Sequence, residues 1–212
     1  MNALASRIVL TTALGLAACL GGCTSSLLQS HAASNQLYVL HAEAPPPGAA
    51  VATGSLRVLR PLPAPGLDTD RLALSRADNR LDYYLGGRWG APLPDVFGDF
   101  AVNALRQAGA WATVTDARVS LNTDYQLLLY LDHFEAVYPQ GSDPVASGAI
   151  PTATVALHGV LVRRRDGAVV ANLAGAAAQQ AGANRMGEVV IALQAAANAA
   201  LSQVAAQAAA AR

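Results

Sequence analysis

The chain has 212 residues, of which 53% are hydrophobic and 13% are charged, and its formal net charge at pH 7 is zero. This balance provides no basic surface for a phosphate backbone, so we expect no nucleic-acid partner. The length is sufficient for one domain with a sizeable core.

Residues 1–22 have the pattern of a lipoprotein signal peptide. The apolar run from Ile8 to Leu20 is shorter than the roughly 20 residues that a membrane-spanning helix needs. It ends in Leu20-Gly21-Gly22-Cys23, which resembles the lipobox of bacterial lipoproteins, where the thiol is acylated and the preceding peptide is removed. We therefore predict that Cys23 is lipidated and becomes the first mature residue. The alternative is an ordinary signal peptide with an incidental cysteine.

Residues 23–36 contain no hydrophobic period and are predicted to be a flexible tether to a domain over residues 37–208. Cys19 lies in the removed segment, so acylation of Cys23 leaves no thiol for a disulfide. Thr24 follows the lipidated position. By resemblance to enterobacterial sorting, where Asp at this position retains a lipoprotein in the inner membrane, we expect the outer membrane, with the domain facing the periplasm.

The first part of the domain alternates short apolar runs with proline-rich loops. Strands are predicted over residues 37–40, 55–60, 71–76 and 80–85. Residues 44–48 must form a loop, residues 61–66 form a stiff turn, and Asp78-Asn79 joins the third and fourth strands.

A helix is predicted from Pro92 to just before Gly109, because apolar residues recur there every three or four positions. Strands follow over residues 111–118, 124–138, 152–163 and 168–175. In the longest of them, Leu127 alternates with other inward leucines and Phe134 falls out of register, which predicts a bulge near Asp132-His133. The turn at residues 165–167 predicts an antiparallel hairpin between the last two strands.

The chain ends in a predicted helix over residues 185–208, whose alanine-rich far end we expect to fray. The order of elements predicts an α+β fold, a single domain with a mainly antiparallel β-sheet packed by two α-helices.

Several short motifs occur in a definite order: Tyr38-Val39-Leu40, Leu56-Arg57-Val58 with Pro61, Pro63 and Leu67, Asp78-Asn79-Arg80-Leu81, Arg88-Trp89-Gly90-Ala91-Pro92-Leu93, Asp124-Tyr125-Gln126-Leu127 with Phe134, and Asp166-Gly167. With this order, the chain from Tyr38 to Val204 resembles the ABC-type transport auxiliary lipoprotein family, which includes the paraquat-inducible protein C type. The chain departs from the family pattern at Leu85-Gly86-Gly87, which is unusually rich in glycine.

The resemblance implies a non-enzymatic, lipid-anchored component of an envelope lipid-transport system. Its implied partners are a periplasmic MCE-domain protein and inner-membrane ABC or permease components, and the chain would dock the MCE conduit at the outer membrane. Homo-oligomerisation is a further hypothesis. An outer-membrane assembly lipoprotein that plugs or chaperones a barrel is the alternative function, and an anchored hydrolase is a third.

The motif residues Arg88, Trp89, Pro92 and Leu93 are a candidate partner-binding or structural site. A tryptophan just before a helix more often packs against that helix, so we favour the structural interpretation. The basic run at residues 163–165 could meet anionic head groups, but a charge run at a turn is more often a solvated tip.

Catalytic, metal and cofactor sites are not predicted. The histidines lack metal-ligand spacing, and the mature chain has no nucleophile elbow, phosphate-binding loop or catalytic cysteine. A triad from Asp132, His133 and Ser142 or Ser147 is disfavoured, because neighbouring strand residues point to opposite faces.

Overall fold

The computed structural model describes residues 35–43, 52–76, 80–139, 142 and 148–212. The chain divides into two compact units after Ser34, and the described residues belong to the second, Asn35–Arg212. Three sequence features lie outside the described residues: the segment that contains Cys23, the loop at residues 44–48 and the turn at Asp78-Asn79.

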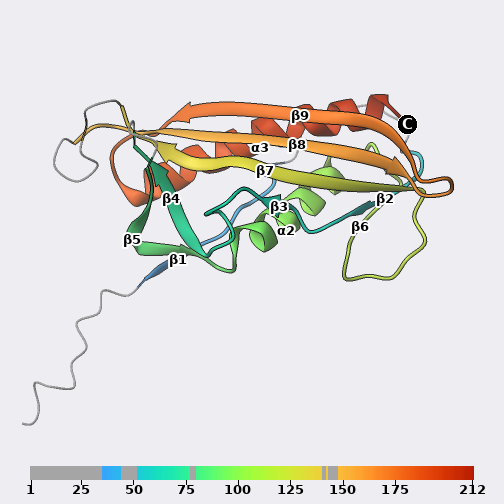
Figure 1. Cartoon of the computed structure of the whole chain (residues 1–212), viewed down its shortest axis with the longest axis horizontal. Coiled ribbons are helices and arrows are strands. Elements are labelled where there is room, and N and C mark those ends of the chain that lie inside the picture. The colour runs from blue at the N-terminus through green and yellow to red at the C-terminus, as the bar shows by residue number, and fades with distance from the viewer. Residues whose placement is uncertain (1–34, 44–51, 77–79, 140–141, 143–147) are drawn as a thin grey trace, which may run out of the picture. The chain divides into compact units, whose positions relative to one another are not determined.

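The sheet is built around one long strand, β7 (Tyr125–Val137). On one edge β7 pairs antiparallel with β8 (Thr152–Arg163), which in turn pairs antiparallel with β9 (Ala168–Gln180) (Figure 1). On its other edge β7 pairs in parallel with three short strands one after another: β2 (Ser55–Val58), β3 (Leu62–Pro63) and β4 (Arg71–Ser75).

Three further strands extend this second side of the sheet: β6 (Thr113–Asp116) beside β2, β5 (Leu81–Trp89) beside β4, and β1 (Gln36–Tyr38) beside β5. The β1 and β6 pairings are parallel, whereas β5 is antiparallel to β4. The long ladders are therefore antiparallel, and short parallel strands complete a mixed sheet.

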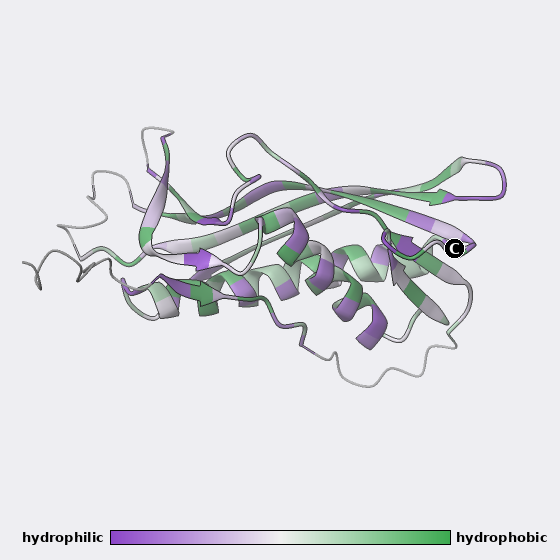
Figure 2. Cartoon of the chain, turned by 90° about the horizontal axis from the view of Figure 1, so that it is seen from below, coloured by the Kyte–Doolittle hydropathy of each residue, from purple (hydrophilic) through white to green (hydrophobic). Residues whose placement is uncertain are grey.

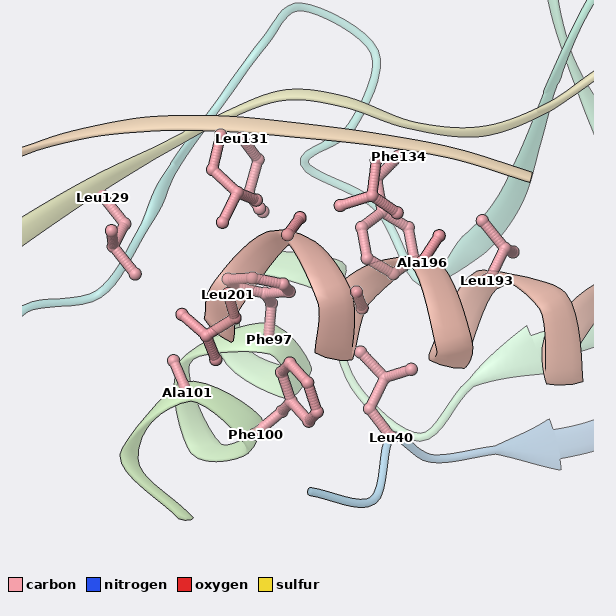
Figure 3. Packing of buried hydrophobic residues seen from close by; sticks show 14 of the residues in the cluster. Leu40, Phe97, Phe100, Ala101, Leu129, Leu131, Phe134, Leu193, Ala196 and Leu201 are labelled. Atoms are coloured by element: carbon pink, nitrogen blue, oxygen red, sulfur yellow. The ribbon is translucent and has the colours of Figure 1, made fainter. Parts of the chain in front are cut away.

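Two helices, α2 (Leu93–Gln107) and α3 (Met186–Ala210), lie against the same face of this sheet (Figures 1 and 2). Figure 3 shows the core between them, where Phe97 and Phe100 of α2 and Leu201 of α3 lie beneath Leu131 and Phe134 of β7. All five side chains are at most 1% exposed. Burial of this apolar surface at about 25 cal/mol per Å² is the main force that holds the helices on the sheet.

Helix α3 approaches β9 very closely, because both are made of small residues at the contact. A Cβ atom on Gly175 of β9 would overlap the backbone carbonyl of Ala200, so only glycine fits there. Helix α3 has the length and mean hydropathy of a membrane-spanning helix, but half of its most apolar stretch is buried within the domain. We therefore assign α3 as a core helix.

Polar side chains of α3 form hydrogen bonds to the backbone of neighbouring segments on both sides of the helix. Gln203 and Gln207 each form two hydrogen bonds to β9: the side-chain oxygens accept from the N–H groups of Ala176 and Ala174, and the side-chain NH2 groups donate to the carbonyls of the same two residues, over 2.7–3.3 Å. The two glutamines thus occupy part of the free edge of β9, as a neighbouring strand would. On the opposite flank, Gln194 and Asn198 accept from the N–H groups of His41 and Glu43.

The α+β fold with two helices is confirmed, as are the antiparallel β8–β9 hairpin and the bulge, which falls between Leu131 and His133. Four details of the sequence prediction are wrong. Strand β5 continues through Gly86 to Trp89 instead of ending at Leu85, because a bulge absorbs the glycines. The expected turn at residues 61–66 contains β3, whose pairing is continued by a hydrogen bond from the N–H of Ala64 to β7.

The third error concerns the end of α3. This helix continues to Ala210 instead of fraying, because Val204 and Ala208 are fully buried. Tertiary packing therefore fixes the end of a helix that is mostly alanine. Strand β9 is also longer than expected and extends to Gln180.

Candidate functional site

The motif at residues 88–93 connects β5 to α2, and it buries Trp89 and Leu93 while Arg88 and Pro92 remain exposed. Trp89 is 2% exposed and packs edge-on against Phe134, with ring centroids 5.7 Å apart. Leu93 is also 2% exposed, and Pro92 is the N-cap residue of α2. Arg88 points away from this core and forms an ion pair with Asp70 at 3.1 Å. Of these four candidates, Trp89 and Leu93 are unavailable to a partner, whereas Arg88 is about half exposed.

Of the residues considered for a catalytic triad, Asp132 and His133 have different partners, and the hydroxyl of Ser142 donates to the backbone carbonyl of Pro139. Ser147 lies outside the described residues. His133 is hydrogen-bonded to Glu135 at 2.8 Å, whereas Asp132 is hydrogen-bonded to His158 at 2.6 Å. The ring of His158 stacks on Tyr130 with centroids 4.4 Å apart. The bulge separates the side chains of Asp132 and His133 onto different partners, as expected for neighbouring strand residues.

The hairpin between β8 and β9 borders an open hollow of about 740 Å³ at one end of the sheet. Four arginines line it, three from the hairpin and one from the chain end: Arg163, Arg164, Arg165 and Arg212. The carboxylate of Asp124, from the start of β7, and residues 53–54 before β2 complete the wall. Four separate segments thus converge there. We call this feature the arginine hollow.

The arginines of the hollow differ in how their charges are used. Arg163 is bound to Asp166, with its Nε 3.2 and 3.1 Å from the two carboxylate oxygens, and Arg165 lies 3.6 Å from the same carboxylate. Among the described residues, the guanidinium of Arg164 donates two long hydrogen bonds, of 3.5 Å, to neutral oxygens. The guanidinium of Arg212 lies 5.0 Å over the ring of Trp111 and donates to backbone carbonyls, including that of Thr53 at 2.9 Å.

The two carboxylates at the hollow remain ionised. Hydrogen bonds from the hydroxyl and the backbone N–H of Ser55 lower the pKa of Asp124. The hydrogen bonds from Arg163 lower the pKa of Asp166. With four guanidinium groups against two carboxylates, the side chains give the hollow a positive field that suits an anionic partner.

The sequence indicated only part of this hollow. The basic run at residues 163–165 lies at a turn as expected, and the side chain of Arg165 is 75% exposed, as in a solvated tip. Nothing in the sequence spacing indicated that Arg212 joins it, because this contact requires α3 to continue along the whole sheet. Among the described residues, no group of three or more His, Cys, Asp or Glu side chains is arranged to hold a metal ion.

Comparison with protein families gives one match, to the ABC-type transport auxiliary lipoprotein component, over residues 38–209. The chain belongs to this family. The match includes α2, all but the last residue of α3, and all but the first residues of the sheet. The members of this family are auxiliary lipoproteins of ABC-type transport. Membership implies attachment to a membrane of the envelope, and it does not imply a catalytic role. A comparison with curated proteins finds no match.

Solved structures give the same fold for this auxiliary lipoprotein. Protein XCC0632 from Xanthomonas campestris is 23% identical, with a TM-score of 0.68, and the match covers 81% of this chain and 97% of that one. An uncharacterised protein is 14% identical, with a TM-score of 0.59 over 82% of this chain and 97% of its own. PelC from Paraburkholderia phytofirmans, a dodecamer, is 20% identical over 75% and 94% of the two chains, but a TM-score of 0.42 carries no information about assembly here.

Proposed function

We propose that this chain is a lipid-anchored accessory component of an MCE-type envelope lipid-transport system. In this proposal acylated Cys23 holds it at the outer membrane, and the domain faces the periplasm and docks an MCE-domain protein that is connected to inner-membrane ABC or permease components. The observation that carries the proposal is the family match over residues 38–209. The specific transport partner and the membrane are inferences from the family resemblance and from Thr24.

The arrangement of the domain supports a docking role. The described chain begins with β1 at one end of the sheet, whereas the arginine hollow lies at the opposite end of β7 and β8 (Figure 1). Thirteen residues of β7 at about 3.3 Å each separate the two ends by roughly 40 Å. A tether attached at β1 would therefore leave the hollow free to face the periplasm.

We propose that the occupant of the hollow is an acidic segment of the periplasmic partner. Guanidinium groups bind carboxylates with paired, charge-assisted hydrogen bonds. Arg164 has no carboxylate partner within the hollow, and Arg165 shares that of Arg163, so both are available for such contacts.

The test is purification of the acylated protein from its native envelope after cross-linking, with mass spectrometry of the partners and of residue 23. Recovery of MCE and ABC components with a diacylglyceryl group on Cys23 is the expected result. Recovery of barrel-assembly proteins instead would favour the alternative function. Hydrolytic turnover of a substrate that is lost when one nucleophilic residue is mutated would favour a hydrolase. Sedimentation of the acylated protein would test the predicted homo-oligomer.

A matched pair of charge reversals tests the docking surface. The side chains of Arg165 and Arg185 are 75% and 76% exposed, and each lies within 4 Å of one carboxylate, but Arg185 precedes α3, away from the hollow. Arg165→Glu is expected to reduce partner recovery strongly, whereas Arg185→Glu leaves it unchanged. Equal recovery with both variants would exclude the hollow as the docking surface.

A further inference from the structure

The glycine-rich departure from the family pattern, Leu85-Gly86-Gly87, forms a protruding bulge in β5. Between two paired positions, Arg71↔Arg88 and Ala73↔Tyr83, β4 advances by two residues while β5 advances by five. The extra residues are pushed out of the ladder, and Gly86 adopts a positive φ of 81° that other residues rarely take. Nothing lies within 4 Å of the place where its Cβ atom would be. A glycine is therefore favoured here by the backbone conformation and not by lack of space for a side chain.

The bulge presents an apolar side chain to solvent. Leu85 is 88% exposed, the highest value among the large hydrophobic residues that the structure describes. The next highest is Leu37, at 70%, on the adjacent strand β1. Val39, two residues further along the chain, is 51% exposed. A single exposed leucine needs no explanation. Here the two most exposed apolar side chains lie on two paired strands, and one of them is held out by a glycine.

Basic side chains lie beside Leu37. Leu37 pairs with Arg88 across the β1–β5 ladder, and Arg88 pairs with Arg71 across the β5–β4 ladder, so the three side chains form a row on one face. Arg71 lies 4.1 Å over the ring of Tyr83, and Arg88 is bound to Asp70. Apolar tips flanked by arginines are typical of surfaces that enter the interfacial region of a bilayer. We call Leu37, Val39, Leu85, Arg71 and Arg88 the β1–β5 patch.

We propose that the β1–β5 patch contacts the lipid surface to which the chain is anchored, with Leu37 and Leu85 inserted among the acyl chains and Arg71 and Arg88 at the anionic head groups. The orientation rests on the proposed anchor at Cys23. Leu37 is fourteen residues from Cys23, a distance that an extended chain spans with at most about 50 Å. The anchor therefore keeps this end of the sheet within about 50 Å of the membrane. Insertion of Leu37 and Leu85 would then hold this end at the surface and leave the arginine hollow, at the other end of β7, facing away from it.

The experiment uses the chain without residues 1–22, with Cys23→Ala and an amino-terminal histidine tag, bound to vesicles of phosphatidylcholine and phosphatidylglycerol that contain a nickel-chelating lipid. This attachment replaces acylation, so the result does not depend on whether Cys23 is lipidated. Since the chain then has no cysteine, Leu85→Cys gives a single site for an environment-sensitive nitrobenzoxadiazole dye. The matched control is Leu121→Cys, a leucine that is 50% exposed beside the arginine hollow.

The dye at position 85 is expected to shift to shorter emission wavelength on vesicles and to be quenched by lipids brominated in their acyl chains. The dye at position 121 is expected to remain in water, without shift or quenching. Adding Leu37→Ser to the labelled Leu85→Cys chain should weaken quenching at position 85, because one of the two inserted side chains is lost.

Three results would overturn the proposal: no quenching at position 85, equal quenching at positions 85 and 121, or quenching at position 85 that is indifferent to Leu37→Ser. A failure here leaves the transport proposal standing if Cys23 is found acylated and MCE partners are recovered. Conversely, quenching at position 85 with barrel-assembly partners in the native envelope would retain the membrane contact and reject the transport function.

Discussion

Trp89 illustrates how a residue of a recognisable motif can serve the core alone. Its indole is almost fully buried, and together with Phe97 it lies edge-on to Phe134, so it links β5 and α2 to β7. Aromatic pairs in this geometry add stability beyond the area they bury. A direct partner contact by Trp89 would require the core to open.

Trp89→Ala should therefore lower the free energy of unfolding by about 3–5 kcal/mol, as expected when a large aromatic is removed from a core. Arg88→Ala, which removes an exposed ion pair with Asp70, should cost less than about 1 kcal/mol. Urea unfolding of both variants measures the difference. A stable Trp89→Ala protein that fails to bind its partner would contradict the packing role.

A second residue-scale feature is a chain of partly buried hydroxyls. The Tyr138 hydroxyl donates to the side-chain oxygen of Asn184 at 2.6 Å and lies 2.9 Å from the Tyr84 hydroxyl. Burial raises the pKa of both tyrosines, so both hydroxyls stay protonated and able to donate. This chain joins β5 and β7 to the segment that precedes α3.

Tyr138→Phe should lower the free energy of unfolding by about 1–3 kcal/mol, because it removes both hydrogen bonds and leaves the Tyr84 hydroxyl without this partner. Tyr84→Phe should cost only about 1 kcal/mol, since the bond from Tyr138 to Asn184 remains. Thermal unfolding of the two variants measures which substitution costs more stability. An equal loss for both would show that the hydroxyls do not act as a chain.

At the scale of elements, side chains of α3 form hydrogen bonds to the free edge of β9. The row of N–H and C=O groups on an edge strand is a template for pairing with another chain. Gln203 and Gln207, one turn apart on the helix, match Ala176 and Ala174, two residues apart on the strand. The rise of four helical residues, about 6 Å, is close to that of two strand residues, about 6.6 Å.

Replacement of Gln203 and Gln207 together by alanine should lower the free energy of unfolding by about 2–4 kcal/mol, at roughly 1 kcal/mol for each of the four bonds. It should also promote aggregation, because the edge becomes free to pair. Urea unfolding and light scattering measure the two effects. Ser202→Ala is the control, since its hydroxyl bonds within the helix to Asn198. If the double variant behaved like this control, the glutamines would not protect the edge.

The accuracy of the sequence predictions differs between elements for physical reasons. Strand β8 and helix α2 were predicted almost to the residue, because alternation and helical periodicity are local signals. The bulge after Leu131 was also visible, since Phe134 is out of phase. The extension of β5, the pairing of β3 and the end of α3 depend on contacts with distant strands, which a single sequence does not contain. The arginine hollow depends on such contacts too, through Arg212.

At the scale of the molecule, the hollow end of the sheet should weaken in acid. Asp124 has a lowered pKa in the folded state because its carboxylate accepts the hydroxyl and N–H of Ser55. Its stabilisation is complete above the ordinary aspartate pKa of about 4 and is lost as the pH falls through the lowered folded-state value. Asp124→Asn should therefore lose less stability than the parent between about pH 7 and 3 in urea unfolding. If Asp124→Asn and the parent lost the same free energy of unfolding in acid, ionised Asp124 would not stabilise this end of the sheet.

Partner binding through the arginine hollow should depend on salt but not on pH in the neutral range. Guanidinium groups keep their charge, the pKa values of Asp124 and Asp166 are lowered, and no histidine lines the hollow among the described residues. The charge of its wall is then constant between about pH 5.5 and 8, whereas salt screens its attraction for an acidic segment over about 8 Å at physiological ionic strength. Affinity for the purified partner should be flat across this pH range and fall steadily with added sodium chloride. A partner that binds as well in high salt, or only below pH 6, would have to use another surface.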